Sequence, residues 1–365
     1  NAGRTATYTL AAAPALGTLK NDSVTINTNN SFTQADINAN KITYTPNADA
    51  NGTDSFTFSV SDGTNSVSDI FNITITAVND APAVSGLPAA ITVDEDQPGN
   101  VDLSAAVFSD ADGDALTVTL TASTGTFTVS SAGGISVGGS GTGTGTLTLL
   151  GTAADINSFL DSVSNIQYIG ALNQNGNNAA AFTVHASDGT VNPLLGTVSV
   201  NIAAVNDDPN VTGLPTDITA AENTASNVDL SAASFSDVDA GSNSVTLILT
   251  VNTGILSASS GGGVAVAGSG TSELTLTGTV SNIDTYLDTA SNIQYTGPAG
   301  MSGDNAATLT LAANDGGNTG AGGGADVTLG TVNIDITEAP PAVTNVSSAK
   351  TDGTYGIGEV IEITV

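Results

Sequence analysis

The chain has 365 residues, and its 35 Asp and Glu residues against 4 Lys and Arg residues give it a net charge of −31 at pH 7. This balance excludes nucleic acid as a partner, because phosphate binding needs a positive surface. No run of about 18 apolar residues occurs, so we expect no membrane insertion. The chain has no cysteine, which excludes disulfides and thiolate metal sites.

The few basic residues lie towards the two ends of the chain, at Arg4, Lys20, Lys41 and Lys350. Between positions 41 and 350 no Lys or Arg is available to neutralise a carboxylate. Metal cations or a saline medium are the natural counter-charge for such a surface. The acidic residues are also clustered rather than scattered, which favours specific sites over a role in solubility alone.

Alternating strands dominate the chain from its beginning. The first residues, "NAGRTATYTL", are not a signal peptide, and we expect the chain to be a piece of a longer protein. Apolar and polar residues alternate in Asp54–Gly63, Asp114–Ser123 and Asn243–Asn252, as in strands with one buried face. Stretches rich in Gly, Asn and Asp separate the strands. This pattern predicts an all-β fold of antiparallel Ig-like β-sandwiches.

One segment in the middle of the chain departs from strand alternation and predicts a short helix. It is "GTAADINSFLDSVSNIQY", from Gly151 to Tyr168. Thr152 is suited to the N-cap position, and Asp155 would lie in the first turn. Four apolar residues follow at helical spacing, namely Ile156, Phe159, Leu160 and Val163. We expect such a helix in each repeat, because "FTQADINANKITYTPN" near the amino terminus resembles this passage.

Internal repeats set the predicted domain organisation. "VNDAP" at position 78 returns as "VNDDP" at position 205, 127 residues later, and "SNIQY" at 164 returns at 291, again 127 residues later. We predict two full repeats at 83–208 and 210–338, and a partial one at 1–80 that lacks its first strands. Residues 342–365 would begin a further Ig-like β-module. Repeats joined by short linkers predict a linear rod.

Acidic and amide residues recur at matching places in these repeats. Each linker carries an Asn-Asp pair, and an Asp-x-Asp turn follows 30 residues later. A Glu ends the expected first strand of each full repeat, and an Asp lies about 20 residues before the linker or module end that follows each repeat. The candidate ligands are Asp62, Asn79, Asp80, Glu95, Asp110, Asp112, Asp114, Asp188, Asn206, Asp207, Glu222, Asp237, Asp239, Asp315 and Glu338.

The expected course of the strands gathers these residues at the junctions between repeats. A first strand that crosses the sandwich would bring Glu95 to the far end, close to Asp188 and the Asn206–Asp207 linker. The Asp-x-Asp turn would return to the near end, beside Asn79 and Asp80. Calcium prefers 6–8 oxygen ligands in flexible geometry, whereas zinc prefers His or Cys. The sequence therefore predicts Ca²⁺ at the junctions.

A Glu late in the first strand, an Asn-Asp linker and an Asp-x-Asp turn resemble the cadherin repeat. The chain is most similar to the tandem bacterial cadherin-like repeats of giant calcium-binding, RTX-type surface adhesins, in which "VNDAP" linkers are habitual. The resemblance implies cadherin-like β-sandwiches in an extracellular stalk, with Ca²⁺ at the junctions and neighbouring repeats of the same chain as partners. Other copies of the protein, or surface glycans, are further expected partners. The third repeat departs from the pattern, because "ITEAPP" has no Asn-Asp, and Glu338 would act in its place.

We expect no enzymatic activity, because without a Cys or a second His no pair of nucleophile and general base is evident. The single histidine, His185, falls on a predicted strand at a position where the other repeats have Ser59 and Ala312. Two alternatives to a calcium-stiffened stalk stay open. One is a carbohydrate-binding cadherin-like module of an extracellular polysaccharide-degrading or biofilm protein, and the other is a salt-adapted rod without specific ions.

Overall fold

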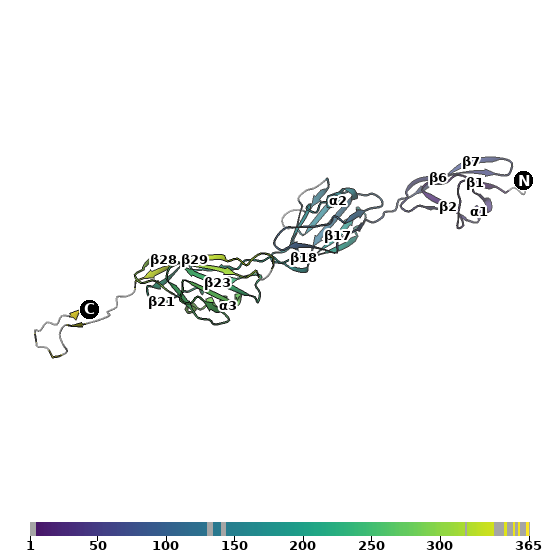
Figure 1. Ribbon diagram of the computed structural model, residues 1–365. Helices are drawn as coiled ribbons and strands as arrows, with labels where there is room; N and C mark the ends of the chain where they lie inside the picture. Colours follow the sequence, from purple (N-terminus) through teal and green to yellow (C-terminus); the bar gives the residue numbers. More distant parts are fainter. Residues whose placement is uncertain are drawn as a thin grey trace. The chain divides into compact units, whose positions relative to one another are not determined.

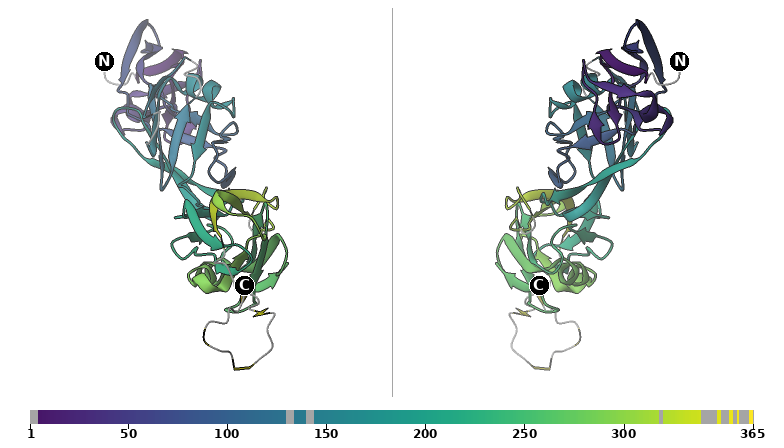
Figure 2. Two further views of the ribbon diagram at one scale, coloured as in Figure 1. Left: turned by 90° about the vertical axis from the view of Figure 1, so that its left-hand side faces the viewer. Right: turned by 90° about the vertical axis from the view of Figure 1, so that its right-hand side faces the viewer.

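The computed structural model describes residues 5–129, 134–139, 144–317 and 320–338, together with 347–348, 353–354, 357 and 363–364. The chain divides into two compact units, Asn1–Ile202 and Ala203–Val365, and we describe each by itself. Within the described residues the first unit contains two hydrophobic cores and the second contains one. Sheets dominate every module, so the all-β expectation is confirmed (Figure 1 and Figure 2). The expected module at 342–365 lies almost entirely outside the described residues.

The first module packs a four-stranded sheet, of order β4-β1-β6-β7, and a three-stranded sheet, of order β3-β2-β5, around a small core. That core comprises Leu10, Leu19, Ile26, Phe32 and Phe56. Its elements are β1 Thr7–Ala12, β2 Gly17–Asn21, β3 Val24–Thr25, β4 Ser31–Thr33, α1 Gln34–Asn38, β5 Ile42–Pro46, β6 Gly52–Ser61 and β7 Ser66–Ile75.

The second module is larger and adds strands to both layers. Its six-stranded sheet has the order β14-β15-β12-β17-β18-β9, and a three-stranded sheet of order β10-β16-β13 faces it. The elements are β8 Ala83–Ser85, β9 Ala90–Asp94, β10 Gly99–Asn100, β11 Val107–Ser109, β12 Leu116–Ala122, β13 Thr126–Val129, β14 Ser136–Gly138, β15 Thr146–Gly151, α2 Ala153–Leu160, β16 Ile166–Ile169, β17 Gly176–Ser187 and β18 Leu194–Ala203.

The third module repeats this plan with a six-stranded sheet, β20-β29-β28-β23-β26-β25, and a three-stranded sheet, β21-β27-β24. Its elements are β19 Asn210–Thr212, β20 Asp217–Ala221, β21 Ala225–Asn227, β22 Ser234–Ser236, β23 Ser244–Val251, β24 Ile255–Ala258, β25 Ala265–Ala267, β26 Glu273–Thr279, α3 Val280–Leu287, a 3-10 turn Ala290–Asn292, β27 Ile293–Thr296, β28 Gly303–Asn314 and β29 Val327–Thr337. Beyond it, β30 Ser347–Ser348 pairs with β31 Ile363–Thr364.

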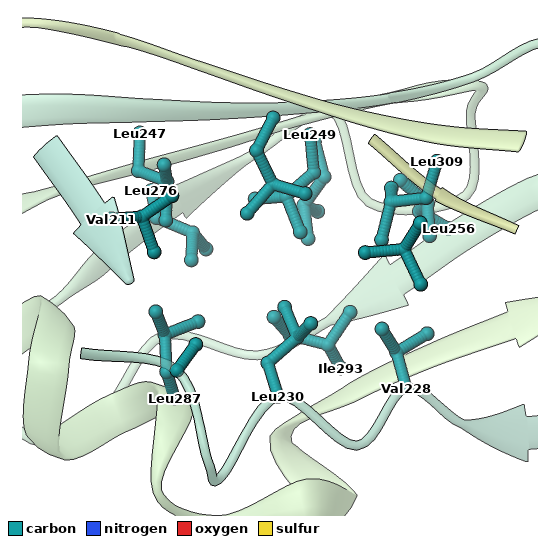
Figure 3. Close-up of a cluster of buried hydrophobic side chains, with 14 of the residues drawn as sticks. Val211, Val228, Leu230, Leu247, Leu249, Leu256, Leu276, Leu287, Ile293 and Leu309 are labelled. Carbon is teal, nitrogen blue, oxygen red and sulfur yellow. The ribbon is translucent and has the colours of Figure 1, made fainter. Parts of the chain in front are cut away.

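Alternation along the strands builds the cores. In β23 every second residue is buried, and Leu247 and Leu249 point from the large sheet towards the opposite layer (Figure 3). Leu230 and Ile293 meet them from the smaller layer. Burial of such side chains contributes about 1.5–3 kcal/mol each relative to exposure. Aliphatic residues therefore supply most of the core, as the low aromatic content requires.

One short helix occurs in each module, as expected. In the second module α2 begins after Thr152, whose side chain accepts a hydrogen bond from the Asp155 N–H. Ile156, Phe159 and Leu160 are buried, but the helix ends at Leu160. Val163 lies beyond it and is 39% exposed, so the prediction that Val163 belongs to the helix is wrong. No helix among the described residues has the length and apolar character that would cross a membrane.

A buried carboxylate fixes the loop between β1 and β2 in the first module. Asp54 accepts hydrogen bonds from the N–H groups of Ala15 and Leu16, both at 2.9 Å, and from the Tyr44 hydroxyl at 2.7 Å. Burial alone would raise the pKa of Asp54, but these bonds and that from the Ser55 N–H lower it to about 2. Burial and the hydrogen bond to Asp54 raise the pKa of Tyr44 to about 12.

We expect the first module to lose stability in acid through Asp54. Because the folded-state pKa, about 2, lies below the ordinary value of 3.8, the ionised carboxylate stabilises the fold above pH 4. This contribution is lost as the pH falls from 4 towards 2. Replacing Asp54→Ala should cost at least about 2 kcal/mol at neutral pH, because buried donors lose a charged acceptor.

Scanning calorimetry between pH 2 and pH 6 would measure this effect. The transition of the first module should fall in temperature on acidification in the parent chain, and less so in Asp54→Ala. Asp69→Ala is the matched control, because Asp69 lies exposed on β7 and accepts from the N–H of its neighbour Ile70. Equal acid sensitivity in the parent and Asp54→Ala chains would contradict the assignment.

Candidate metal centre

A turn rich in carboxylates lies in the second module between β11 and β12. Asp110 anchors this turn, since its Oδ1 accepts the N–H of Asp112 at 3.0 Å and that of Asp114 at 3.5 Å. One carboxylate oxygen from each of these three residues lies within 4.8 Å of the other two. The turn therefore directs three acidic side chains towards one small volume.

The linker before the module is fastened to the same turn. The Asp80 N–H donates to Oδ2 of Asp112 at 2.7 Å. The Asn79 side-chain amide donates to Oδ2 of Asp188 at 2.9 Å, while Oδ1 of Asp188 accepts the N–H of Thr190. We call this group the second-module cluster; it consists of Asn79, Asp80, Asp110, Asp112, Asp114 and Asp188.

The third module repeats both of the hydrogen bonds that hold the linker. The Asp207 N–H donates to Oδ2 of Asp239 at 2.5 Å, and the Asn206 amide donates to Oδ2 of Asp315 at 2.5 Å. In both modules the paired residues are 32 and 109 positions apart. We call this group the third-module cluster; it consists of Asn206, Asp207, Asp237, Asp239 and Asp315.

The positions of Asp188 and Asp315 correct the expectation that they lie with the linker that follows. β12 starts just after the acidic turn, and β17 runs antiparallel to it with Thr117 opposite Ser187. The end of β17 therefore returns to the end of the module where the turn lies. Asp188 thus contacts Asn79 of the preceding linker and lies at the opposite end from where we predicted it.

Glu95 and Glu222 lie at the far end of their modules, away from the acidic turns. Glu95 follows β9, is fully buried, and accepts the Asn175 side-chain amide at 2.9 Å. Glu222 follows β20, which runs parallel to β29, and accepts the Gly300 N–H at 2.6 Å. The structure thus joins each Glu to the loop that precedes the long strand, β17 or β28.

Two of the predicted residues stand apart from the clusters. Asp62 follows β6 and accepts the N–H groups of Thr64 and Asn65 in its own hairpin. The β6–β7 register places it at the opposite end from the Asn79–Asp80 linker, so its assignment to that junction is wrong. Glu338 is exposed just after β29, and the residues that follow it lie outside the described part of the chain.

The second-module cluster concentrates negative charge. Burial raises the pKa of Asp80, and repulsion from the carboxylates of Asp49 and Asp112 raises it further. In contrast, the pKa of Asp188 is lowered by hydrogen bonds from the Val191 N–H and the Asn79 amide. The cluster therefore holds an ionised carboxylate beside others that repel one another, and the nearby linker offers no cationic side chain.

Two carboxylate oxygens at equivalent places are buried and accept no hydrogen bond. They are Oδ2 of Asp110 and Oδ2 of Asp237, the first acids of the two turns. The side-chain Oδ1 of Asn206 is buried in the same way. A buried oxygen without a donor costs about 1–3 kcal/mol, and more when charged. These donor sets, built of oxygen alone, fit a hard divalent cation.

Sequence reasoning missed Asp49 in the first module and Asn175 in the second. Asp49 precedes β6. Charge repulsion from its carboxylate, and a hydrogen bond between the two side chains, raise the pKa of Asp80. Asn175 occupies the matching loop before β17 and bonds Glu95. The recurring spacing of acidic residues does not include these two positions. Both residues, however, lie in the loop before a long strand, β6 or β17, and that shared position could have identified them.

A glycine-rich loop between β28 and β29 was also missed, although it holds the linker of the third module. Ala321 donates its N–H to the Ala204 carbonyl and accepts the Asn206 N–H, both at 3.2 Å. Gly323 has φ +71°, and a Cβ there would collide with the Asn206 side chain. The signal for it was length, because Val332 lies 134 residues beyond Val198 rather than 127.

Two-layer sandwiches recur along the chain, and the second and third modules carry acidic turns beside their linkers. Residues 2–75 match the protein family described as Cadherin-like. The order β4-β1-β6-β7 of that module returns as β15-β12-β17-β18 and as β26-β23-β28-β29, so the later modules share its topology. No curated protein matches the chain.

Among solved structures, mouse protocadherin-24 EC1-3 is 11% identical, with 91% of this chain and 90% of that chain covered and a TM-score of 0.34. Human protocadherin-24 EC1-2 is 15% identical, with 72% and 100% covered and a TM-score of 0.30. An endo-fucoidan hydrolase of glycoside hydrolase family 107 is 14% identical, with 91% of this chain covered and a TM-score of 0.22. The chain spans 39% of that hydrolase.

We expect Asp112→Ala to free the Asp80 amide. Its N–H would lose the carboxylate acceptor at 2.7 Å, so hydrogen exchange at Asp80 should become at least about tenfold faster, equivalent to one lost hydrogen bond of about 1.4 kcal/mol. Asp114→Ala removes a charge from the same turn without touching that bond and serves as the control. If the two variants exchange at the same rate, Asp112 does not anchor the linker.

We expect Gly323→Ala to destabilise the third module, because the added methyl group displaces the Asn206 side chain. Gly322→Ala is the matched control: its φ of +101° carries similar backbone strain, but no atom lies within 4 Å of its Cβ. The difference between the two variants should be about 1–3 kcal/mol. It would be measured as a shift of the third-module transition in calorimetry, and equal transitions would refute the clasp.

Proposed function

We propose that this chain is a structural extender, or stalk, segment of a large extracellular adhesin or cell-surface filament, and that Ca²⁺ bound beside its linkers stiffens it. The observation that carries this proposal is the pair of buried, unpartnered oxygens on Asp110 and Asp237. They occupy the same place in two modules, so an accident in one turn does not explain them. Both lie in turns that hold the linker by a main-chain hydrogen bond.

The donor chemistry favours Ca²⁺ over other ions. In the second-module cluster Asp110, Asp112, Asp114 and Asp80 would supply carboxylate oxygens, and main-chain carbonyls and water would complete a shell of 6–8 ligands. Mg²⁺ demands a more regular octahedron, and Zn²⁺ prefers nitrogen or sulfur. The chain offers one His and no Cys, so a zinc site has little support.

Binding would change how firmly the linker is held. In the absence of a cation the carboxylates repel one another, as the raised pKa of Asp80 indicates. A bound cation reverses the sign of this interaction and joins the turn to the linker that enters it. At tenfold excess over its dissociation constant, one such ion adds about 1.4 kcal/mol to the stability of the ordered state.

A stalk requires repeated modules with ordered linkers, and it needs no active site. The repeated topology supports the first of these requirements, and the clusters that hold the linkers support the second. We propose an extracellular location, where Ca²⁺ at millimolar concentration would load modules with dissociation constants of about 10⁻⁴–10⁻³ M. Carbohydrate binding receives no comparable support in the second and third modules, because their large aromatic side chains, such as Tyr168, Tyr295 and Phe182, are fully buried.

A calcium titration of the whole chain tests this proposal. Addition of Ca²⁺ should raise the melting temperatures of the second and third modules, and protect their linkers from proteolysis, at a concentration near 1 mM. Mg²⁺ should act more weakly. The double variant Asp110→Asn/Asp237→Asn should lose at least about tenfold in Ca²⁺ affinity, because each turn loses a buried charged ligand.

The matched control is Asp161→Asn/Asp288→Asn. These residues are the exposed C-caps of α2 and α3, so the control removes the same number of charges from the same two modules. It should respond to Ca²⁺ as the parent chain does. A chain that melts at the same temperature with Ca²⁺ and with chelator, or an equal loss of affinity in both double variants, would overturn the proposal.

A further inference from the structure

Within the described residues, β7 of the first module has no strand on its outer side, whereas the corresponding strands of the other two modules each pair with a further strand. In the sheet β4-β1-β6-β7, β7 is the last strand (Figure 1). In the second module the corresponding strand, β18, pairs with β9, and in the third module β29 pairs with β20. The open edge of β7 is thus the place of a strand that this chain supplies twice elsewhere.

Because β7 lies at the edge of the sheet, several of its apolar side chains are exposed to solvent. The sequence "FNITIT" at 71–76 corresponds to "VNIDIT" at 332–337 in β29. Phe71 is 54% exposed, whereas Val332 is fully buried, as is Val198 at the same position of β18. Val67 and Ile70 of the same strand are 73% and 56% exposed. An exposed, apolar edge strand is a site of strand addition.

An apolar groove accompanies the open edge. It has a volume of about 340 Å³, and Tyr8, Phe32, Ile42, Phe58 and Phe71 are among the residues that line it. In the second module the corresponding space is filled by the segment before β12. That segment buries Ile91, Val93, Val101, Leu103, Ala106 and Phe108 in the core. Residues 1–80 contain no equivalent of this segment.

The main chain of β7 is also prepared for a parallel partner. In β29 the Asn333 N–H donates to the Thr216 carbonyl at the start of β20, and the strands run parallel with Asp217 opposite Asn333. Asn72 corresponds to Asn333, so its N–H faces outwards from the sheet. The outward N–H of Ile70, two residues earlier, is bonded to the side chain of Asp69.

We propose that the first module binds an extended repeat segment, which adds a parallel strand to β7 and fills the aromatic groove. The occupant is a polypeptide stretch with the apolar pattern of residues 83–110 of this chain. It comes from outside the described residues, because the two segments of this kind within them are already paired in their own modules. Main-chain bonds supply the register, and alternate apolar side chains supply the specificity.

A synthetic peptide of sequence 83–110 is the probe, used with the full 365-residue chain. A fluorescent label on the peptide reports binding as a rise in anisotropy, and a scrambled peptide of the same composition is the control. The peptide should also raise the melting temperature of the first module. Binding no tighter than that of the scrambled peptide would overturn the proposal.

Substitutions locate the binding surface. Phe71→Asp places a charge in the groove and should weaken binding at least about tenfold, because it removes one buried aromatic contact. Val24→Asp is the matched control, since Val24 is 69% exposed on β3 and does not line the groove. Equal losses in the two variants would place the peptide elsewhere and refute the site.

Cross-linking tests the parallel register, because the chain has no cysteine of its own. Ala90 of the probe corresponds to Asp217, so it should lie opposite Asn72, within the Cα separation of about 4.4–6.8 Å that a disulfide requires. Under oxidised glutathione, Asn72→Cys should cross-link to a peptide with Ala90→Cys and not to one with Asp94→Cys. Preferential cross-linking to Asp94→Cys would refute parallel addition. Dimers of the chain that the peptide fails to compete would show that β7 pairs with itself, and would also refute the proposal.

Discussion

The hydrogen bond from a linker amide to a carboxylate of the next turn is the interaction on which the acidic clusters depend. Asp80 donates to Asp112, and Asp207 donates to Asp239. Each bond holds the linker against a turn. In that turn Oδ1 of the first Asp already accepts a hydrogen bond from a main-chain N–H. The second oxygen of that Asp is then enclosed without a donor. The contacts that hold the linker and the oxygens that lack a donor thus belong to the same few residues.

The three modules share one arrangement of central strands and stabilise their ends by different means. The first relies on Asp54, which binds three main-chain amides and the Tyr44 hydroxyl. The second relies on the cluster and on the buried Glu95 at its far end. The third adds a glycine-rich loop that pairs with its linker. Polar anchors of this kind suit modules whose cores are mainly aliphatic.

Much of this fold follows from the sequence, because alternation and repeat spacing are local signals. The strands at 54–61 and 116–122 and the N-cap at Thr152 are examples. The predicted position of Asp188 was wrong because it was assigned to the end of the module that carries the following linker, Asn206–Asp207. The antiparallel pairing of β12 with β17 decides it instead. Asp49 escaped notice because its contribution depends on a long-range approach to Asp80, which no spacing rule encodes.

The pairing of Ala321 with Ala204 and Asn206 has a mechanical consequence. These bonds form an isolated parallel bridge between Val205 and Ala321, where the chain enters the third module. Tension applied along the linker would load them in shear, so that both must break together instead of opening one after the other. A pulling force on the linker would thus reach these two bonds before it reaches the first short strand, β19.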